Sequence, residues 1–304
     1  METLKKIEHL SSDTSGRLPE PPRAIPLALR PARFLFGTLG YIFPRPAARV
    51  AYRFFSTPRI RAKHKSSDEL LESARVFEFL YGREMLKGYE WGSGEKVVLL
   101  VHGWESRGTA LRAFVPPLLN KGFRVVAFDG PAHGNSDGRR TNLLHFGGAV
   151  RAVLNQAGGA YGIITHSFGG ASTVFTLSQL DPSIRVEKLV LIGVPNSIDK
   201  VLNDAIETLN VPPPAARHFF RYIERKVQFP VEHANLSRAN GLMQVRRSLI
   251  VHDKQDAVVP FAEGMATFEA WDNASMLASD GLGHYLLMKD PGVIQRVADF
   301  VGEE

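Results

Sequence analysis

Residues 165–170 read Thr-His-Ser-Phe-Gly-Gly, and Ser167 in this stretch is the most informative position of the chain. The stretch joins an apolar, β-prone segment (161–165) to a helical pattern. A serine at such a junction fits a nucleophile elbow, a turn so sharp that side chains two positions either side must be small. The serine hydroxyl then stands clear of the sheet, and N–H groups at the helix start point toward its reaction partner. Ser167 is therefore predicted to be a nucleophile.

Apolar strands and helical patterns alternate on both sides of this turn. A predicted hairpin (75–81 and 84–91) is followed by strands at 96–101, 123–128, 161–165, 188–193, 248–252 and 275–279. Helical patterns lie at 109–120, 143–156, 167–180, 261–270 and 291–301. Continuous apolar strands separated by helices are typical of an α/β fold whose mostly parallel sheet is covered on both faces. Right-handed crossovers then bring the loops after the strands to one edge of the sheet.

One long insertion, at about 196–247, interrupts this alternation between the fourth and fifth parallel strands. It contains an amphipathic pattern from Ile198 to Leu209, three consecutive prolines at 212–214, and an aromatic-rich helix at 215–227. An insertion at this point overhangs the edge of the sheet that carries Ser167. We predict that it is a helical lid; the alternative is a helical insertion that only packs.

The segment before residue 74 differs from the rest in charge and proline content. Residues 17–65 contain eleven Lys or Arg and one acid, a local net charge of +10, whereas the whole chain carries +6. Eight of the nineteen prolines lie between residues 19 and 58, which predicts short helices broken by proline. We therefore divide the chain into a basic Pro/Arg-rich extension (1–73) and a main domain (74–304). Three roles for the extension stay open: a surface that lies on anionic membrane, a flap over the active site, or a segment that packs on the main domain.

Composition excludes several classes of function. There are no cysteines, so disulfides, thiolate metal sites and a cysteine nucleophile are absent, which fits a reducing cytoplasm. The N-terminus lacks the apolar region of a signal peptide, and the apolar run at 34–43 is shorter than the about 20 residues that span a bilayer. The charges outside residues 17–65 sum to −4, and this acidic balance and the lack of a recognition module argue against nucleic-acid binding. We predict a cytoplasmic protein, with peripheral membrane contact through the extension as the open alternative.

Two backbone N–H groups beside Ser167 are candidates for an oxyanion hole. Residues 101–104 read Val-His-Gly-Trp at the end of the first parallel strand. A glycine there lets the chain turn so that the N–H of Trp104 faces the same cavity as the N–H of Phe168. Two such donors can stabilise a negatively charged oxygen.

Five short motifs occur in a fixed order along the chain. They are His-Gly-x at 102–104, Asp-x-Pro-x-His-Gly-x-Ser at 129–136, His-Ser-x-Gly-Gly at 166–170, Asp-x-x-Val-Pro at 256–260 and Gly-x-Gly-His at 281–284. Together they resemble the α/β-hydrolase superfamily, from about residue 75 to the C-terminus. The resemblance implies an α/β-hydrolase fold with a helical lid, and it does not cover the extension. One departure is Thr165, because the family's elbow usually opens with glycine.

The resemblance also implies a catalytic triad. The family's acid lies in the loop after the strand that follows the lid, where Asp256 matches the family position. Asp253 stands where the family often has glycine and reads as a turn-capping residue. His284, 28 residues beyond Asp256, follows the last strand, and the order Ser167, Asp256, His284 is the order that this fold uses. His102 and His166 lie beside the site, and we expect them to orient its loops.

The implied function is that of a serine esterase. His284, held by Asp256, would take the proton of Ser167, and the N–H groups of Trp104 and Phe168 would stabilise the tetrahedral anion. This chemistry requires no metal and no organic cofactor, and its substrate would be a small-molecule acyl ester. A thioesterase, an amide or peptide hydrolase, and a non-catalytic ligand-binding homologue are the alternatives. The sequence predicts no oligomeric state.

Overall fold

The described residues form one nine-stranded sheet. The protein is represented by a computed structural model, which describes residues 5–10, 27–62, 64 and 68–303. The strand order is β1-β9-β8-β7-β6-β4-β5-β3-β2, and only the pairs β2–β3 and β3–β5 are antiparallel. The strands are β1 (Ile7–His9), β2 (Arg75–Tyr81), β3 (Glu84–Trp91), β4 (Val97–Val101), β5 (Arg124–Phe128), β6 (Gly162–His166), β7 (Arg185–Ile192), β8 (Gln244–Asp253) and β9 (Ala274–Ser279). The predicted mostly parallel sheet is confirmed.

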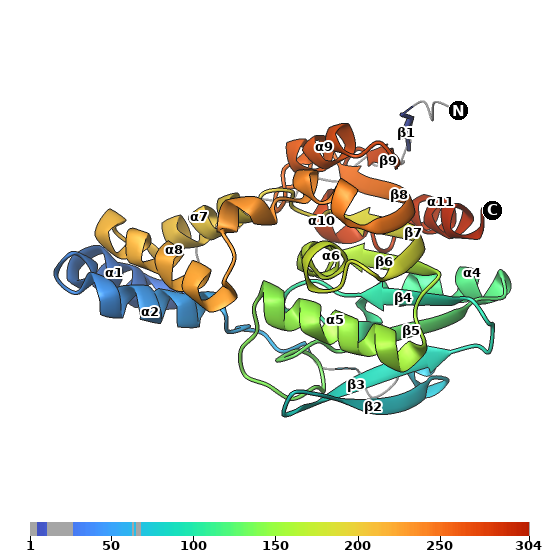
Figure 1. Ribbon diagram of the computed structural model, residues 1–304, viewed down its shortest axis with the longest axis horizontal. Helices are drawn as coiled ribbons and strands as arrows, with labels where there is room; N and C mark the ends of the chain where they lie inside the picture. The colour runs from blue at the N-terminus through green and yellow to red at the C-terminus, as the bar shows by residue number, and fades with distance from the viewer. Residues whose placement is uncertain (1–4, 11–26, 63, 65–67, 304) are drawn as a thin grey trace.

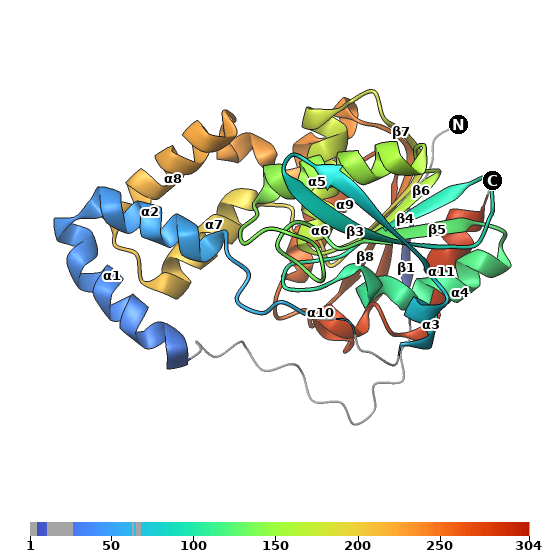
Figure 2. The same cartoon turned by 90° about the horizontal axis from the view of Figure 1, so that it is seen from below.

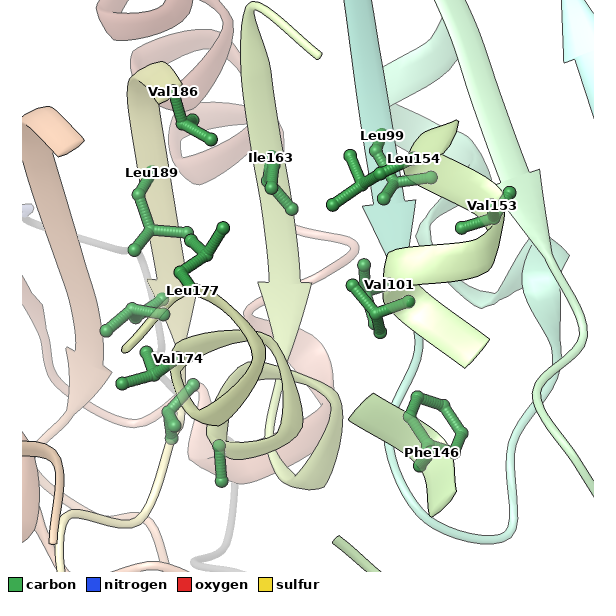
Figure 3. Close-up of a cluster of buried hydrophobic side chains, with 14 of the residues drawn as sticks. Leu99, Val101, Phe146, Val153, Leu154, Ile163, Val174, Leu177, Val186 and Leu189 are labelled. Carbon is green, nitrogen blue, oxygen red and sulfur yellow. The ribbon is translucent and has the colours of Figure 1, made fainter. Parts of the chain in front are cut away.

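Helices cover both faces of the sheet, as Figure 1 shows. On one face, α5 (Leu143–Ala157), α6 (Phe168–Phe175) and α9 (Phe261–Ala270) pack on a buried apolar layer, part of which Figure 3 shows between α5, β4, β6 and β7. On the other face, α4 (Val115–Asn120) and α11 (Pro291–Gly302) cover a second layer. Burial of apolar side chains on both faces explains why the central strands are continuous apolar runs.

Element boundaries differ from the prediction where the backbone turns. The predicted helix 109–120 begins as a 3₁₀ helix, Gly108–Phe114, and α4 follows it with prolines in its first turn, where their missing N–H groups cost nothing. The predicted helix 167–180 ends in a π-helical segment, Thr176–Leu180. Strand β7 ends one residue before its predicted end, because Gly193 turns the chain with φ of 56°.

One strand of the sheet comes from the N-terminal extension. Strand β1 pairs in parallel with β9, and Leu10 N–H continues the ladder with a 2.9 Å bond to Ala278 O. The carboxylate of Glu8 accepts a 2.6 Å bond from Arg296 on α11. A strand of three residues is too short to show an alternating apolar pattern, so the sequence did not predict β1.

Four helices form a separate group beside the sheet, which we call the cap. They are α1 (Arg30–Ile42), α2 (Pro44–Phe55), α7 (Ile198–Leu209) and α8 (Pro213–Val227). Figures 1 and 2 both place α1 and α2 at the outer end of the molecule, against α7 and α8. The cap has its own buried core, to which each helix contributes, including Phe36, Tyr52, Ile206 and Phe219. The extension therefore packs on the insertion.

Polar contacts join the two parts of the cap. Arg33 on α1 donates to the carbonyl oxygens of Glu207 and Thr208 in the last turn of α7. Asn210, which ends α7 in a left-handed conformation, donates from Nδ2 to Arg33 O at 3.2 Å. A cation at a helix C-terminus satisfies free carbonyl groups and interacts favourably with the helix dipole. Segments more than 170 residues apart in the sequence are thus held together.

The helices offer no membrane-spanning segment. Within residues 5–10, 27–62, 64 and 68–303, none of them is both long enough and apolar enough to cross a bilayer. The longest helices, α5 and α8, have 15 residues each, short of the about 20 that a crossing needs.

Candidate active site

Ser167 occupies a strained turn between β6 and α6. Its backbone has φ of 51° and ψ of −125°, a region that residues with a side chain rarely adopt. The Ser167 N–H donates to Ile192 O at 2.9 Å, which ties the turn to the end of the neighbouring strand. Strain of this kind persists only where the surrounding structure holds it, and it is frequent at functional sites. The backbone of Ser167 therefore has the conformation that a nucleophile elbow requires.

Thr165 is accommodated at the start of this turn. Its side chain is fully buried, and its hydroxyl donates to Val190 O on β7 at 2.9 Å. A Cβ atom added at Gly170 would lie 2.8 Å from Thr165 Oγ1 and 2.3 Å from Val194. The absence of a side chain at residue 170 leaves room for the threonine, which explains how this departure from the family pattern fits.

His284 and Asp256 form a buried pair. His284 lies in α10 (Gly283–Leu286), and its Nδ1–H donates to Asp256 Oδ2 at 2.7 Å. Asp256 Oδ1 accepts from the N–H groups of Val258 and Val259, both at 2.8 Å. Burial alone would raise the pKa of Asp256, but the bond from His284 and these two N–H groups outweigh it and lower the pKa. Asp256 is thus held as a carboxylate that orients the imidazole.

Asp253 has a different set of partners. Its Oδ2 accepts from Ser279 Oγ at 2.6 Å and from Leu282 N–H at 2.9 Å, and its Oδ1 accepts from Gln255 N–H. These bonds fasten the end of β8 to the loop that carries His284. The structure therefore brings Asp256 to the histidine and uses Asp253 to hold the loop.

Ser167 and His284 both lie next to the end of β7. Ile192, the last residue of β7, accepts the hydrogen bond from Ser167 N–H. The next residue is Gly193, and a Cβ atom added there would lie 3.1 Å from His284 Nδ1. His166 packs on the His284 ring with centroids 4.6 Å apart, and its Nε2–H donates to His284 O at 3.1 Å. The hydrogen bonds of these two described residues do not include one from Ser167 Oγ to His284. Such bonds often form only when substrate is bound.

The two candidate oxyanion donors lie side by side. The rings of Trp104 and Phe168 pack edge to face with centroids 5.2 Å apart. A Cβ added at Gly103 would lie 3.3 Å from Ser167 Cβ, so the loop after β4 passes directly against the serine. Phe168 is the first residue of α6, where N–H groups have no partner within the helix. The residues that carry both N–H groups are thus neighbours of the serine, Trp104 through Gly103 and Phe168 directly.

Buried neutral histidines hold the loops around the serine. His102 donates from Nδ1 to Gly103 O and accepts from Gly130 N–H at Nε2, which links the loops after β4 and β5. His133 likewise accepts a 3.0 Å bond from Glu105 N–H at its Nε2. Burial lowers the pKa of His133 and of His166 to about 3, and it also lowers the pKa of His102. These rings therefore act as fixed hydrogen-bonding groups, in line with the positioning role predicted for His102 and His166.

Ser167 opens into an apolar cavity of about 390 Å³. Its walls come from the turn itself, from the cap helices α2, α7 and α8, and from the start of α5. Arg59 and Asp204 are the only charged residues among the described residues that line it. Among all the residues that the structure describes, no group of three or more His, Cys, Asp or Glu side chains is arranged to hold a metal ion. The cavity is suited to an apolar, uncharged group.

The sequence alone did not decide among the three roles of the extension, one of which is a flap over the active site. Tyr52, Phe54 and Phe55 of α2 line the cavity together with Thr57 and Arg59. No local signal could have revealed this, because these aromatic residues match the pattern of any helix that packs on a core.

The chain that leads from α2 back to the sheet is fastened to the loops of the site. Arg59 N–H donates to Glu105 Oε1 at 2.8 Å, one residue after Trp104. His64 donates from Nε2 to the carboxylate of Asp129 at 3.0 Å, and Tyr89 donates to the same carboxylate at 2.8 Å. The position of the cap is therefore coupled to the loops after β4 and β5.

Comparison with known proteins adds sequence relatives. A sequence model of the family described as Alpha/beta hydrolase family matches residues 98–297. A Danio rerio protein named serine hydrolase-like protein is 26% identical over 204 residues, which cover 62% of this chain and 62% of that protein. The pyrethroid hydrolase of Sphingobium wenxiniae is 32% identical over 117 residues, 33% of this chain and 42% of that protein. The chain thus matches less than two thirds of the length of either relative.

A solved structure resembles most of the chain. The esterase Pf2001 of Pyrococcus furiosus superposes with a TM-score of 0.61 at 20% identity, covering 79% of this chain and 96% of that one. At this level of identity the likeness concerns the fold.

Proposed function

Because the chain belongs to the alpha/beta hydrolase family, we propose that it hydrolyses carboxylic esters through an acyl-enzyme intermediate on Ser167. The family and the relatives named above support hydrolase activity, and the α/β-hydrolase fold expected from the sequence is confirmed. One observation carries the choice of nucleophile. Ser167 sits in a strained turn that opens into an apolar cavity, beside a buried His284–Asp256 pair.

In the first half of the proposed reaction, Ser167 Oγ attacks the ester carbonyl carbon. Because Nδ1 of His284 is bonded to Asp256, Nε2 is the nitrogen available to take the proton of the serine. The carbonyl oxygen becomes an anion, which the N–H groups of Trp104 and Phe168 stabilise. The bond to the alcohol oxygen then breaks, and His284 gives the proton to the departing alcohol.

In the second half, water repeats the attack. His284 takes a proton from the water molecule, whose oxygen forms a bond to the acyl carbon. The same two N–H groups stabilise the second anion. Cleavage of the acyl–Oγ bond returns the proton from His284 to Ser167 and releases the carboxylic acid. The cycle consumes one water per ester and leaves the protein unchanged.

The cavity supports a small-molecule substrate with an apolar acyl group. A lining of Phe, Leu, Val and Ile side chains from α2, α7 and α8 favours burial of hydrocarbon by about 0.8 kcal/mol per methylene. A substrate with several charges would find only Arg59 as a cation among the described lining residues. We therefore expect uncharged esters of medium chain length to be better substrates than acetyl esters.

A fluorophosphonate probe and a panel of nitrophenyl esters test the proposal. We expect the probe to label Ser167 and turnover to rise from acetyl to medium-chain esters. Ser167→Ala should abolish labelling and turnover, while Ser172→Ala, a buried serine on α6, serves as the matched control. Folded protein that shows neither labelling nor turnover would contradict the proposal and favour a ligand-binding role.

The same panel separates the ester from the alternative substrates. Thioesters and anilides with the same acyl group present the same hydrocarbon to the cavity but different leaving groups. Differences in kcat/KM among the three therefore report the leaving group alone. Faster turnover of the thioester or the anilide would reassign the activity while leaving Ser167 as the nucleophile.

A further inference from the structure

We propose that the outer face of the cap docks on the surface of an anionic lipid bilayer. This inference goes beyond the proposed function and does not depend on it. Large hydrophobic side chains that are exposed gather there: of sixteen such side chains among the described residues, nine lie between Leu27 and Phe54. Contiguous exposed apolar surface of this kind marks an interaction site.

Helix α1 is apolar on both of its faces. One face buries Phe36 and Gly40 against the rest of the cap. The opposite face carries Phe34, Leu35, Leu39, Tyr41 and Ile42, whose exposed fractions run from 46% to 70%. A helix that is hydrophobic all round is normally buried or in contact with lipid. The outer face of α1 has no covering element of this chain among the described residues.

An apolar groove of about 520 Å³ lies between α1 and α2 on this face. Leu35, Leu39 and Phe43 line it from one side, and Val50 and Phe54 line it from the other. Phe54 also lines the cavity of Ser167, so the outer groove and the inner cavity share this side chain. A groove that borders the active-site cavity would give an apolar substrate a short path from lipid to the serine.

Arginines flank the apolar surface. Arg45, Arg49 and Arg53 are exposed at four-residue spacing on α2, next to the groove residues Val50 and Phe54. Arg45 and Arg49 also face a second groove, together with exposed Arg221, Arg225 and Lys226 of α8. Among the described residues that line this groove, Glu224 is the only acid.

This combination of charge and apolar surface fits an anionic membrane. Residues 27–62 contain no Asp or Glu. Amphipathic helices that lie in a bilayer interface bury an apolar face beneath a rim of Lys and Arg, and each such cation near the surface of anionic lipid contributes about 1 kcal/mol. With 13 residues, α1 would extend about 20 Å and lie in the interface.

Vesicle flotation with the full chain tests the proposal. We expect binding to vesicles of equal parts phosphatidylcholine and phosphatidylglycerol, little binding to phosphatidylcholine alone, and weaker binding in high salt. Phe34→Glu/Ile42→Glu should reduce binding to the anionic vesicles at least tenfold. Arg45→Gln/Arg49→Gln should reduce it roughly 30-fold in low salt. None of these four side chains lines the active-site cavity, and circular dichroism with thermal melting checks that each variant is folded.

A matched control comes from β2, an edge strand of the sheet that lies outside the cap. Val76 and Leu80 on β2 are 55% and 66% exposed, and Val76→Glu/Leu80→Glu should leave vesicle binding unchanged. Three results would overturn the proposal. They are no binding of the wild type to anionic vesicles, a loss of vesicle binding in Val76→Glu/Leu80→Glu equal to that in Phe34→Glu/Ile42→Glu, or a loss of binding in Arg45→Gln/Arg49→Gln without any loss in Phe34→Glu/Ile42→Glu. A concentration-dependent dimer that Phe34→Glu/Ile42→Glu breaks, with no vesicle binding by the wild type, would show that the face binds a second copy of this chain.

Discussion

The loop edge of the sheet and the cap are built in different ways, although both line one cavity. At the sheet edge, each candidate residue lies in a short motif that begins where a strand ends, as Trp104 does after β4 and Ser167 after β6. In the cap, helices α1 and α2 find their partners, α7 and α8, more than 140 residues further along the chain. The chemistry of the site is thus encoded locally, and the shape of its cavity is encoded by distant segments.

This difference predicts where substitutions act. A change at the sheet edge should alter the rate of the reaction, because it touches the reacting groups. A change in the cap should alter which substrates are accepted, because cap residues such as Phe55 touch only the acyl group in our proposal. The following experiments test that division, beginning with the largest expected effect.

Asp256→Asn should lower kcat for a nitrophenyl ester by about 10⁴-fold, since loss of the carboxylate leaves His284 without its orienting partner. Asp253→Asn is the matched control three residues away. It loses bonds that hold the loop after β9, so we expect a loss of about 1–3 kcal/mol in the free energy of unfolding and a much smaller change in kcat. A larger fall in kcat for Asp253→Asn than for Asp256→Asn would show that Asp253, and not Asp256, is the catalytic acid.

Acid should lower the free energy of unfolding at pH values well above those at which carboxylates titrate. Burial lowers the pKa of His133 and His166 to about 3, whereas an unfolded histidine has a pKa near 6.5. Between these values the unfolded chain binds protons that the folded one does not, so stability falls as the pH falls. Each histidine contributes about 1.4 kcal/mol per pH unit, or roughly 4 kcal/mol for the two between pH 6.5 and 5.

Urea unfolding at pH 7.5, 6.5, 5.8 and 5 (values chosen to bracket about 6.5, the pKa of unfolded histidine) measures this slope. In His133→Gln/His166→Gln the dependence on pH should be shallower, whatever the absolute stability of the variant. An equal slope in the variant and the wild type would show that other groups cause the acid sensitivity.

Phe55→Ala should change substrate preference. Phe55 lines the cavity and packs edge to face on Phe219, with ring centroids 6.2 Å apart. We expect kcat/KM for a medium-chain ester to fall roughly 10- to 100-fold relative to that for the acetyl ester, from the loss of apolar contact. Phe43→Ala, which alters the outer groove and not the cavity, should leave this ratio unchanged. An equal effect of both substitutions would contradict the role of α2 in the cavity.

Arg33→Ala should loosen the junction between the extension and the insertion. The variant loses two charged hydrogen bonds to the last turn of α7, which we expect to cost about 1–2 kcal/mol locally. Hydrogen exchange in the last turn of α7 measures this loss, and Arg30→Ala, an exposed position on the same helix, is the control. Unchanged exchange in Arg33→Ala would mean that apolar packing alone holds the cap together.

Periodicity predicted most of the sheet because its elements have local signals. The hairpin β2–β3 and helices α7 and α9 begin and end at the predicted residues, since glycine, proline or a change of period marks their ends. Strand β1 was missed because three residues carry no period, and its place depends on pairing with β9. Thr165 could not be judged from the sequence either, because the space that it needs is provided by Gly170.

Sequence patterns alone predict the α/β fold, the nucleophile candidate Ser167, and the candidates for its acid and base. Motifs and strand ends coincide in such a fold, so their order along the chain already predicts which residues share an edge. The structure adds that Asp256, rather than Asp253, bonds to His284, and that the basic extension packs on the insertion to form the cap. Both depend on contacts between segments far apart in the chain, and an amphipathic helix shows which face it buries without showing which partner covers it.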